Sequence, residues 1–113
     1  MRWPGLQRLL REWRGKTHVP RPFSVQARYV QDLSWLAVPA GFTPSAIMGA
    51  AFATQKGALV LIDLSSNTPA TVEATLAHEL VHCEQLAAGM QMNHGAYFAQ
   101  RKAELKERYG VTI

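Results

Sequence analysis

The sequence predicts a single-domain α+β fold, and three observations lead to this prediction. The chain has 113 residues, enough to bury one hydrophobic core but not two. Apolar residues recur with helical periodicity near both ends, whereas residues 23–66 contain the alternating and continuous apolar runs that are typical of strands. The predicted strands are grouped ahead of a C-terminal pair of helices, and no internal repeat is visible. We therefore expect residues 1–113 to form one domain.

The composition is that of an ordinary folded protein. Hydrophobic residues make up 48% of the chain and charged residues 18%, which excludes the charge excess typical of disordered chains. The single cysteine, Cys83, excludes an internal disulfide framework and a Cys₄ zinc ribbon within this chain; we expect a small buried hydrophobe rather than a reactive thiol. Because no apolar run approaches the roughly 18 residues of a membrane span and no secretory signal is visible, we expect a cytoplasmic protein.

Residues 1–22 are expected to form a basic helix and an extended connector. Apolar residues at i, i+3, i+4 and i+7 define one helical stripe: Leu6, Leu9, Leu10 and Trp13. The segment KTHVPRP, with two prolines, predicts the connector. Residues 2–28 hold seven of the twelve basic residues against one acidic residue, Glu12, which gives a charge of +6. This basic surface is either a solvated helix face or a site for DNA or another polyanion, bound through its phosphates.

The predicted strands lie between residues 23 and 66. Phe23 to Val30 alternates apolar and polar residues, which predicts a half-buried strand. Residues 31–45 contain several breaking residues and are expected to form a loop with at most one short strand. The runs 47–54 and 58–64 flank a short connection, in which Gly57 would supply the positive φ of a tight hairpin turn. The second run is almost continuously apolar, so we expect it to be buried on both faces.

A helix is predicted over residues 69–88. Thr68 is a suitable N-cap, and Pro69 suits the first helical position because its missing N–H would have no helical partner there. Gly89 is a typical helix end. On a helical wheel, one face collects the residues that would pack against the core: Val72, Leu76, Leu80, Cys83 and Ala87.

The opposite face of this helix carries the motif HELVH, in which His78, Glu79 and His82 follow the pattern H-E-x-x-H. Residues four apart differ by about 40° around a helix and about 6 Å along it, so both imidazoles project from one face and can share one Zn²⁺. Glu79 is turned by about 100° from His78, which places its carboxylate beside the metal, where it can act as general base on a zinc-activated water. The motif therefore predicts a catalytic zinc site.

A catalytic zinc site needs a third protein ligand and one open position. Asn93 predicts the N-cap of a second helix over residues 93–109, which Gly110 ends. If the two helices are antiparallel, the first turn of the second lies near the end of the first, and His94 can complete the site. Glu104 is a weaker alternative, because the pattern RKAELKER around it is typical of a solvated helix face with i, i+4 charge pairs.

Together these motifs resemble those of the SprT-like zinc metalloprotease family. HELVH is followed, after eleven residues, by HGAYF at 94–98, which is similar to the family motif HGxx(F/W), and the similarity extends more loosely over residues 46–109. The resemblance implies a compact zincin-like domain with Glu79 as the catalytic acid and base. It also implies three zinc ligands: His78, His82 and His94.

The same resemblance implies further roles. Phe98 would pack behind His94, and the strand before the active-site helix, here residues 58–64, would bind an extended protein or peptide substrate as an added strand. Members of the family often act on proteins associated with DNA, which would suit the basic residues 2–28.

We therefore expect a metalloendopeptidase that hydrolyses peptide bonds without a covalent intermediate, with Glu79 moving the proton. Tyr97 or Tyr109 would stabilise the oxyanion, although Tyr97 is more often a core residue at such a position. One alternative is a catalytically inactive, zinc-stabilised binding module with a basic surface that faces nucleic acid. Another is a metal-free protein in which His78 and His82 are hydrogen-bonded core residues.

Overall fold

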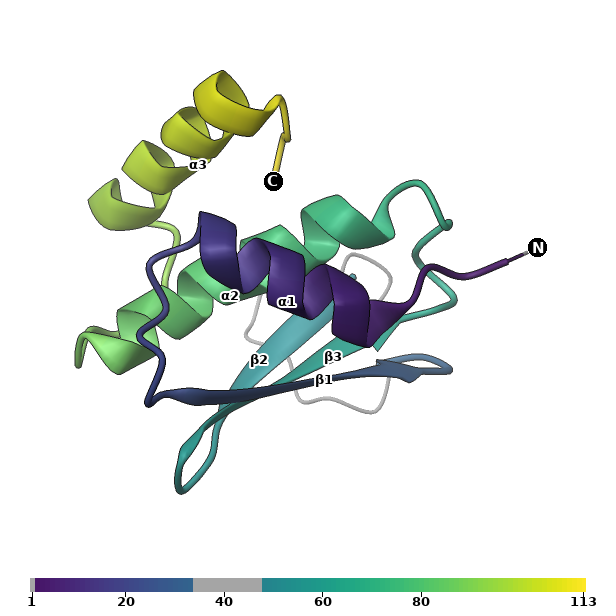
Figure 1. Ribbon diagram of the computed structural model, residues 1–113, viewed down its shortest axis with the longest axis horizontal. Helices are drawn as coiled ribbons and strands as arrows, with labels where there is room; N and C mark the ends of the chain where they lie inside the picture. Colours follow the sequence, from purple (N-terminus) through teal and green to yellow (C-terminus); the bar gives the residue numbers. More distant parts are fainter. Residues whose placement is uncertain (1, 34–47) are drawn as a thin grey trace, which may run out of the picture.

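The computed structural model describes residues 2–33 and 48–113, and these residues form helices on one side of a small sheet (Figure 1). The predicted α+β fold, with its strands grouped before a C-terminal pair of helices, is confirmed. The elements follow the order α1 (Leu6–Lys16), β1 (Ser24–Val30), β2 (Gly49–Ala53), β3 (Gly57–Asp63), α2 (Val72–Ala87) and α3 (Ala96–Tyr109).

The three strands form one mixed sheet in the order β1-β3-β2. β1 runs parallel to β3, with Ala27 opposite Val60, and β2 runs antiparallel to β3, with Ala51 opposite the same valine. β3 is therefore the central strand, with a hydrogen-bonded neighbour on each edge. Its side chains are buried almost throughout, as its continuous apolar run predicted.

The core lies between this sheet and the helices α1 and α2. α2 packs against β2 and β3, while α1 packs against β1 and α2. The predicted apolar stripe of α1 is buried, and so is most of the predicted core face of α2. Side chains from three elements meet there with no exposed surface: Trp13, Val60, Ile62, Leu76 and Leu80. α2 is consequently the most enclosed helix, with eleven buried residues among its sixteen.

Gly57 is required in the hairpin for a reason other than the predicted positive φ. Among the described residues, only Gly89 and Gly110 have positive φ. Gly57 instead opens β3 opposite Ser24, where an added Cβ would lie 1.8 Å from the Ser24 carbonyl oxygen. The predicted turn geometry is therefore wrong, and close approach of β1 is what excludes a side chain.

The helix that carries HELVH begins later than predicted. Residues 68–71 form a turn in which the Thr71 N–H donates to the Thr68 carbonyl, 3.0 Å away, and the Thr68 N–H donates to Thr71 Oγ1, 2.9 Å away. The turn therefore takes up the Thr68 carbonyl and the Thr71 hydroxyl, which a helix that started at Pro69 would have used differently. α2 begins only at Val72. Its predicted end is confirmed, because Gly89 has a φ of 73° and the Met90 N–H donates to the Gln85 carbonyl.

The last helix also begins later than predicted, at Ala96. The Asn93 side chain accepts a hydrogen bond from the Gly95 N–H, 3.0 Å away, and this local turn replaces the predicted cap. His94 therefore lies in the loop between α2 and α3 and not in the first turn of a helix. Gly110, with a φ of 71°, ends α3 as predicted.

The loop predicted over residues 31–45 falls mostly outside the described residues, as does Ile47 at the start of the predicted first hairpin strand. None of the helices in the described ranges is both long enough and apolar enough to cross a membrane.

Candidate metal centre

The side chains of three histidines converge beside α2. His78 and His82 belong to this helix, and His94 belongs to the loop that follows it. His94 Nε2 lies 3.2 Å from His78 Nε2 and 3.2 Å from His82 Nε2. The ligand nitrogens of all three lie within 4.8 Å of one another. Nitrogens bound tetrahedrally to zinc at 2.0–2.1 Å are about 3.3 Å apart, so two of the three separations already match that geometry. The structure thus brings together the three predicted ligands, close enough to bind one metal ion.

Hydrogen bonding alone does not account for this convergence. Gln85 Oε1 lies 2.9 Å from His82 Nδ1, so Nδ1 must be the donor and neutral His82 presents a lone pair on Nε2. His94 Nε2 faces both other histidines but carries at most one proton, which can reach only one of them. A cation among the three nitrogens would satisfy all of the lone pairs together, which is the arrangement expected of a metal centre.

Gln85 connects His82 to the loop that carries His94. Its side chain is fully buried, its Nε2 donates to the Asn93 carbonyl, 3.1 Å away, and its Oε1 also accepts from the Asn93 N–H, 3.3 Å away. One amide therefore fixes the tautomer of one ligand and the position of the residue next to another. Sequence reasoning missed Gln85; its signal was a polar residue three positions after His82 in an apolar helix.

Phe98 packs against the ligand rings, as the family resemblance implied. Its ring centroid lies 4.7 Å from that of His78, 5.0 Å from that of His82 and 4.7 Å from that of His94. The aromatic ring covers one side of the cluster and restricts rotation of all three imidazoles. Phe98 itself is buried, so this contact also attaches the start of α3 to the core.

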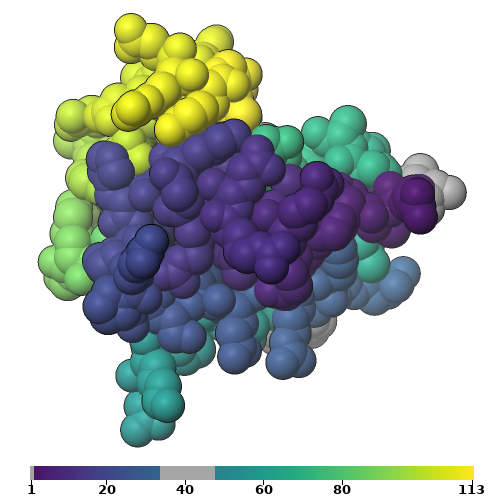
Figure 2. Space-filling view, in the orientation of Figure 1, coloured from purple at the N-terminus to yellow at the C-terminus, as the bar shows by residue number. Residues whose placement is uncertain are grey.

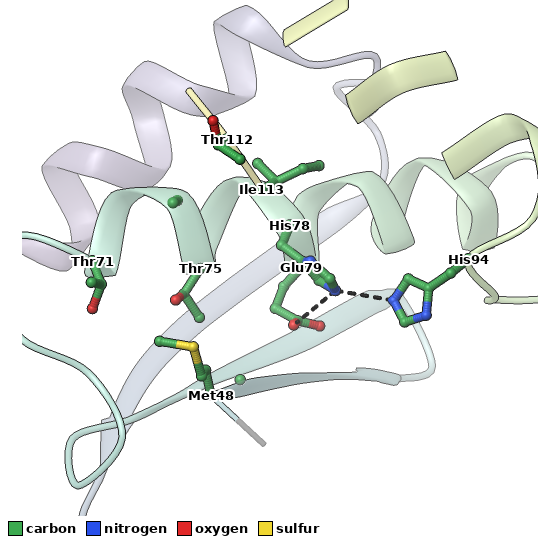
Figure 3. A pocket seen from close by; sticks show the side chains of 10 residues that line it. Met48, Thr71, Thr75, His78, Glu79, His94, Thr112 and Ile113 are labelled. Atoms are coloured by element: carbon green, nitrogen blue, oxygen red, sulfur yellow. Dashed lines mark hydrogen bonds and ion pairs between the residues drawn. The ribbon is translucent and has the colours of Figure 1, made fainter. Parts of the chain in front are cut away.

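Glu79 lies beside the histidines on α2 and is only 5% exposed. Its Oε2 atom is 3.9 Å from His78 Nε2 (Figure 3). Burial raises the pKa of Glu79 to about 8, and burial followed by the nearby histidines His82 and His94 and by Lys102 lowers the pKa of His78 to about 4. His78 is therefore neutral near pH 7 and can donate a lone pair to a metal. A divalent cation beside Glu79 would favour its ionised form again.

A cavity of about 470 Å³ opens onto this group. His78, Glu79 and His94 form one end of it, and the rest follows α2 toward the helix N-terminus (Figure 3). The side of the histidine cluster that Phe98 does not cover is thus accessible to a small molecule or a peptide segment. Ligand-binding cavities typically have volumes of about 300–1,000 Å³.

The other predicted site residues lie elsewhere. Glu104 accepts a hydrogen bond from Arg101 Nη1, 2.8 Å away, and does not belong to the histidine cluster, which decides against it as the third ligand. Tyr109 packs edge-on against Trp13, with ring centroids 5.7 Å apart. The Tyr97 hydroxyl donates to Glu84, and Tyr97 does not line the cavity. The oxyanion role predicted for these tyrosines therefore has no geometric support.

A buried polar network centred on Glu84 connects α2 to α3. Glu84 Oε1 accepts from Arg101 Nε at 2.8 Å and from the Tyr97 hydroxyl at 2.7 Å, and Oε2 accepts from Arg101 Nη2 at 2.9 Å and from the His18 N–H at 2.8 Å. Burial raises the pKa of Glu84, but these hydrogen bonds outweigh it and hold the pKa below its usual range. The sequence offered no sign of this network, because its members are far apart along the chain.

Two further predictions can be checked against the fold. Cys83 is fully buried, and burial raises the pKa of its thiol to about 12, as expected of a small core residue. The proposal that a peptide is added to strand 58–64 is wrong, because β1 and β2 already occupy both edges of β3. In the described part of the chain, the edge strand on the α2 side of the sheet is β2, which pairs only with β3.

Comparison of the chain with family models, with curated proteins and with solved structures found no match. The function is therefore inferred from the geometry of the three histidines, Glu79 and the cavity.

Proposed function

We propose that this protein is a zinc-dependent metalloendopeptidase. The observation that carries the proposal is the combination of three converging histidine nitrogens with a carboxylate 3.9 Å from one of them, beside a cavity that His78, Glu79 and His94 line. A purely structural zinc site usually has four protein ligands, whereas a catalytic one has three and an open position. Three nitrogen donors with an accessible open side fit the second class, and zinc suits imidazole donors.

Glu79 would move the proton during hydrolysis. Zinc, when bound, supplies a Lewis acid that polarises the scissile carbonyl and makes water acidic near neutral pH. The Glu79 carboxylate faces the cavity beside His78, where it would take a proton from the attacking water and return it to the leaving amine. Folding alone does not require a carboxylate at this nearly buried position, which has no salt bridge to Lys or Arg among the described residues.

An extended peptide would lie along the edge of β2 that no other strand of the described residues occupies, in place of strand 58–64, which was first expected to bind it. β2 begins next to the catalytic group, since a Cβ on Gly49 would lie 3.3 Å from Glu79 Cγ and 2.9 Å from Thr75 Cγ2. A peptide paired with this strand would thus pass the histidines at close range. The resemblance of HELVH and HGAYF to the motifs of SprT-like proteases supports the same reaction class.

The decisive experiment compares the wild type with Glu79→Gln and with the control Glu107→Gln, which makes the same chemical change at an exposed position of α3. Each protein is loaded with zinc, its metal content is measured, and cleavage of an unstructured protein is followed. We expect Glu79→Gln to lower the rate at least about 100-fold at equal zinc content, while the control stays active. Equal rates for wild type and Glu79→Gln would refute the general-base assignment.

The inactive binding module makes different predictions in the same experiment. It predicts no cleavage by any variant, one bound equivalent of zinc, and unfolding of the chain when zinc is removed. A zinc content below about half an equivalent in protein purified without chelators would exclude both metal-dependent functions.

Nucleic acid is the second partner that we propose. Five arginines of the basic segment are exposed, and they belong to α1, β1 and the segments next to them, of which Figure 2 shows α1 in front: Arg2, Arg8, Arg11, Arg21 and Arg28. Arg14 is not available, because its Nη2 atom donates to the carbonyls of Pro20 and Phe23. The exposed guanidinium groups could contact phosphates while the cavity holds a protein substrate.

The fluorescence anisotropy of a labelled DNA duplex measures this binding. The double variant Arg8→Gln and Arg11→Gln is compared with Lys102→Gln and Lys106→Gln, a matched charge change on exposed residues of α3. We expect only the arginine variant to bind several-fold more weakly and to reduce the salt dependence of the affinity. Equal losses in the two variants would show that net charge, and not this surface, binds DNA.

A further inference from the structure

The cavity beside the histidines is enclosed by three parts of the chain that are distant in sequence. From α2 and the turn before it come Thr71, Ala74 and Thr75, which follow one another along the helix from its first turn toward His78 (Figure 3). This stripe forms the base of the cavity. The next turn of α2 after this stripe carries His78 and Glu79, so any group that fills the cavity lies next to the proposed reacting centre.

The opposite walls come from the start of β2 and from the segment that follows α3. Met48 and Gly49 lie on one side, and Thr112 and Ile113 lie on the other (Figure 3). Gly110 has a positive φ of 71° at the end of α3, which turns the chain back toward α2 and brings these last two residues to the cavity. The cavity between these walls, of about 470 Å³, has room for a side chain beside His78 and His94.

These walls contain no charged side chain. Apart from Glu79 and the two histidines at one end, the residues that line the cavity are Met, Gly, Ala, Ile and Thr. A charged group placed among them would lose its hydration without meeting a side chain of opposite charge, whereas an aliphatic group would be removed from water against mostly apolar walls. Met48, which is 37% exposed at the cavity, has an unbranched side chain that can adapt to groups of different shape.

We propose that this cavity binds the apolar side chain, of leucine or phenylalanine size, of the substrate residue next to the scissile bond. This inference rests on the proposed peptidase function and adds the class of residue at which the enzyme cleaves. Glu79, His78 and His94 mark the reacting end of the cavity, and walls without charged side chains select the substrate side chain. Binding of acidic and basic side chains is disfavoured in the same place.

The test measures binding to the zinc-loaded full chain, so that it does not depend on turnover. The probes are three peptide hydroxamates that share a chelating group and backbone but carry an isobutyl, a carboxymethyl or an aminobutyl side chain. Dissociation constants are measured by calorimetry. We expect the isobutyl compound to bind at least about tenfold more tightly than either charged compound. Equal affinities for the three compounds would overturn the inference.

A charge placed in the wall sharpens the test. Ala74→Lys puts an ammonium group into the cavity, and Ala88→Lys makes the same change at an exposed position just after α2. We expect Ala74→Lys to weaken the isobutyl compound and strengthen the carboxymethyl compound, with circular dichroism and zinc content unchanged. Ala88→Lys should leave the order of affinities as in the wild type. A loss of selectivity in both variants, or in neither, would contradict the assignment of the cavity.

Cleavage and hydroxamate binding, measured on the same protein, distinguish a wrong assignment of the cavity from a wrong proposed function. Cleavage that depends on Glu79 together with equal hydroxamate affinities would keep the peptidase and reject the apolar cavity. Selective hydroxamate binding without any cleavage would keep the cavity and reject the hydrolysis. In the first case, cleavage of a peptide library would show no apolar preference beside the scissile bond.

Discussion

The two parts of the candidate metal centre are held in different ways. His78 and His82 stand on α2, a helix enclosed by the sheet and by α1, with eleven of its sixteen residues buried. His94 stands in an exposed loop and is placed by Gln85, by Phe98 and by the docking of α3. One half of the centre is therefore fixed by the hydrophobic core, and the other half by a few polar contacts.

This difference shows how a small fold combines a helix enclosed by the core, α2, with a helix, α3, that is attached through Phe98, Leu105 and a buried ion pair. In Figure 1, α3 projects beyond the layer formed by α1 and α2, and its strongest polar contact with that layer is the ion pair between Glu84 and Arg101. Segments with few buried apolar contacts open at lower cost than the global core. We therefore expect metal binding to order the loop and α3 more than α2, because His94 is the one of the three histidines that lies outside α2.

The largest expected effect separates the two kinds of ligand. His82→Ala and His94→Ala should each lower zinc affinity by about a thousandfold or more, measured by competition with a chelator, because each removes one of three donors. In zinc-free protein the two variants should differ. His82 is 9% exposed and hydrogen-bonded to Gln85, so its loss should destabilise the fold, whereas loss of the exposed His94 should not. Equal urea unfolding midpoints for zinc-free His82→Ala and His94→Ala would contradict this difference between the two histidines.

The second prediction tests the anchor of α3. Arg101→Met leaves the Glu84 carboxylate buried without its cation and should destabilise the protein by about 3–5 kcal/mol in urea unfolding. Adding Glu84→Gln should recover part of that loss, because the uncompensated charge is removed. Glu104→Gln is the control, since Glu104 is a partly exposed partner of the same arginine and should cost about 0–1 kcal/mol. A small effect of Arg101→Met would show that apolar contacts hold α3.

Gln85 connects His82 on α2 to the loop that carries His94, and the third prediction tests this connection. Gln85→Leu keeps a buried side chain but removes the acceptor for His82 Nδ1 and both hydrogen bonds to Asn93. Zinc affinity should fall about 10–100-fold, as is typical when the partner of a ligating histidine is lost. Gln91→Leu, an exposed change in the same loop, should leave the affinity unchanged. An effect of the same size in both variants would mean that loop composition matters and not the hydrogen bonds.

The smallest effect distinguishes Gly89, the glycine just after α2, from Gly110, the glycine just after α3. Gly89 and Gly110 both have positive φ, so each Gly→Ala change should cost about 1 kcal/mol of stability. Only Gly89→Ala should also weaken zinc binding, because Gly89 directs the chain into the loop that carries His94, whereas Gly110 follows α3. Paired thermal unfolding and zinc titration of the two variants measure this. If both variants lowered the zinc affinity equally, the conformation at Gly89 would not control the position of His94.

The predicted parts of the site are those that depend on local chain geometry. HELVH on a helix places His78, Glu79 and His82 on one side whatever surrounds the helix, so the spacing was sufficient to predict their relation. The predicted nearness of His94 is confirmed, but its setting in a helix is wrong, because the Asn93 side chain forms a local turn with Gly95. The role of Gln85 depended on a contact with Asn93, eight residues along the chain, that no periodicity reveals.

The sequence by itself determined the α+β class, the core faces of α1 and α2, and the pair of histidines one helical turn apart, because each follows from short-range periodicity. The tertiary structure decided the order of the strands, and with it that β3 is central and cannot bind a further strand. It also decided how the third histidine reaches the other two and which walls enclose the cavity beside them. These features depend on contacts between residues that are distant along the chain, and only the packed molecule brings such residues together.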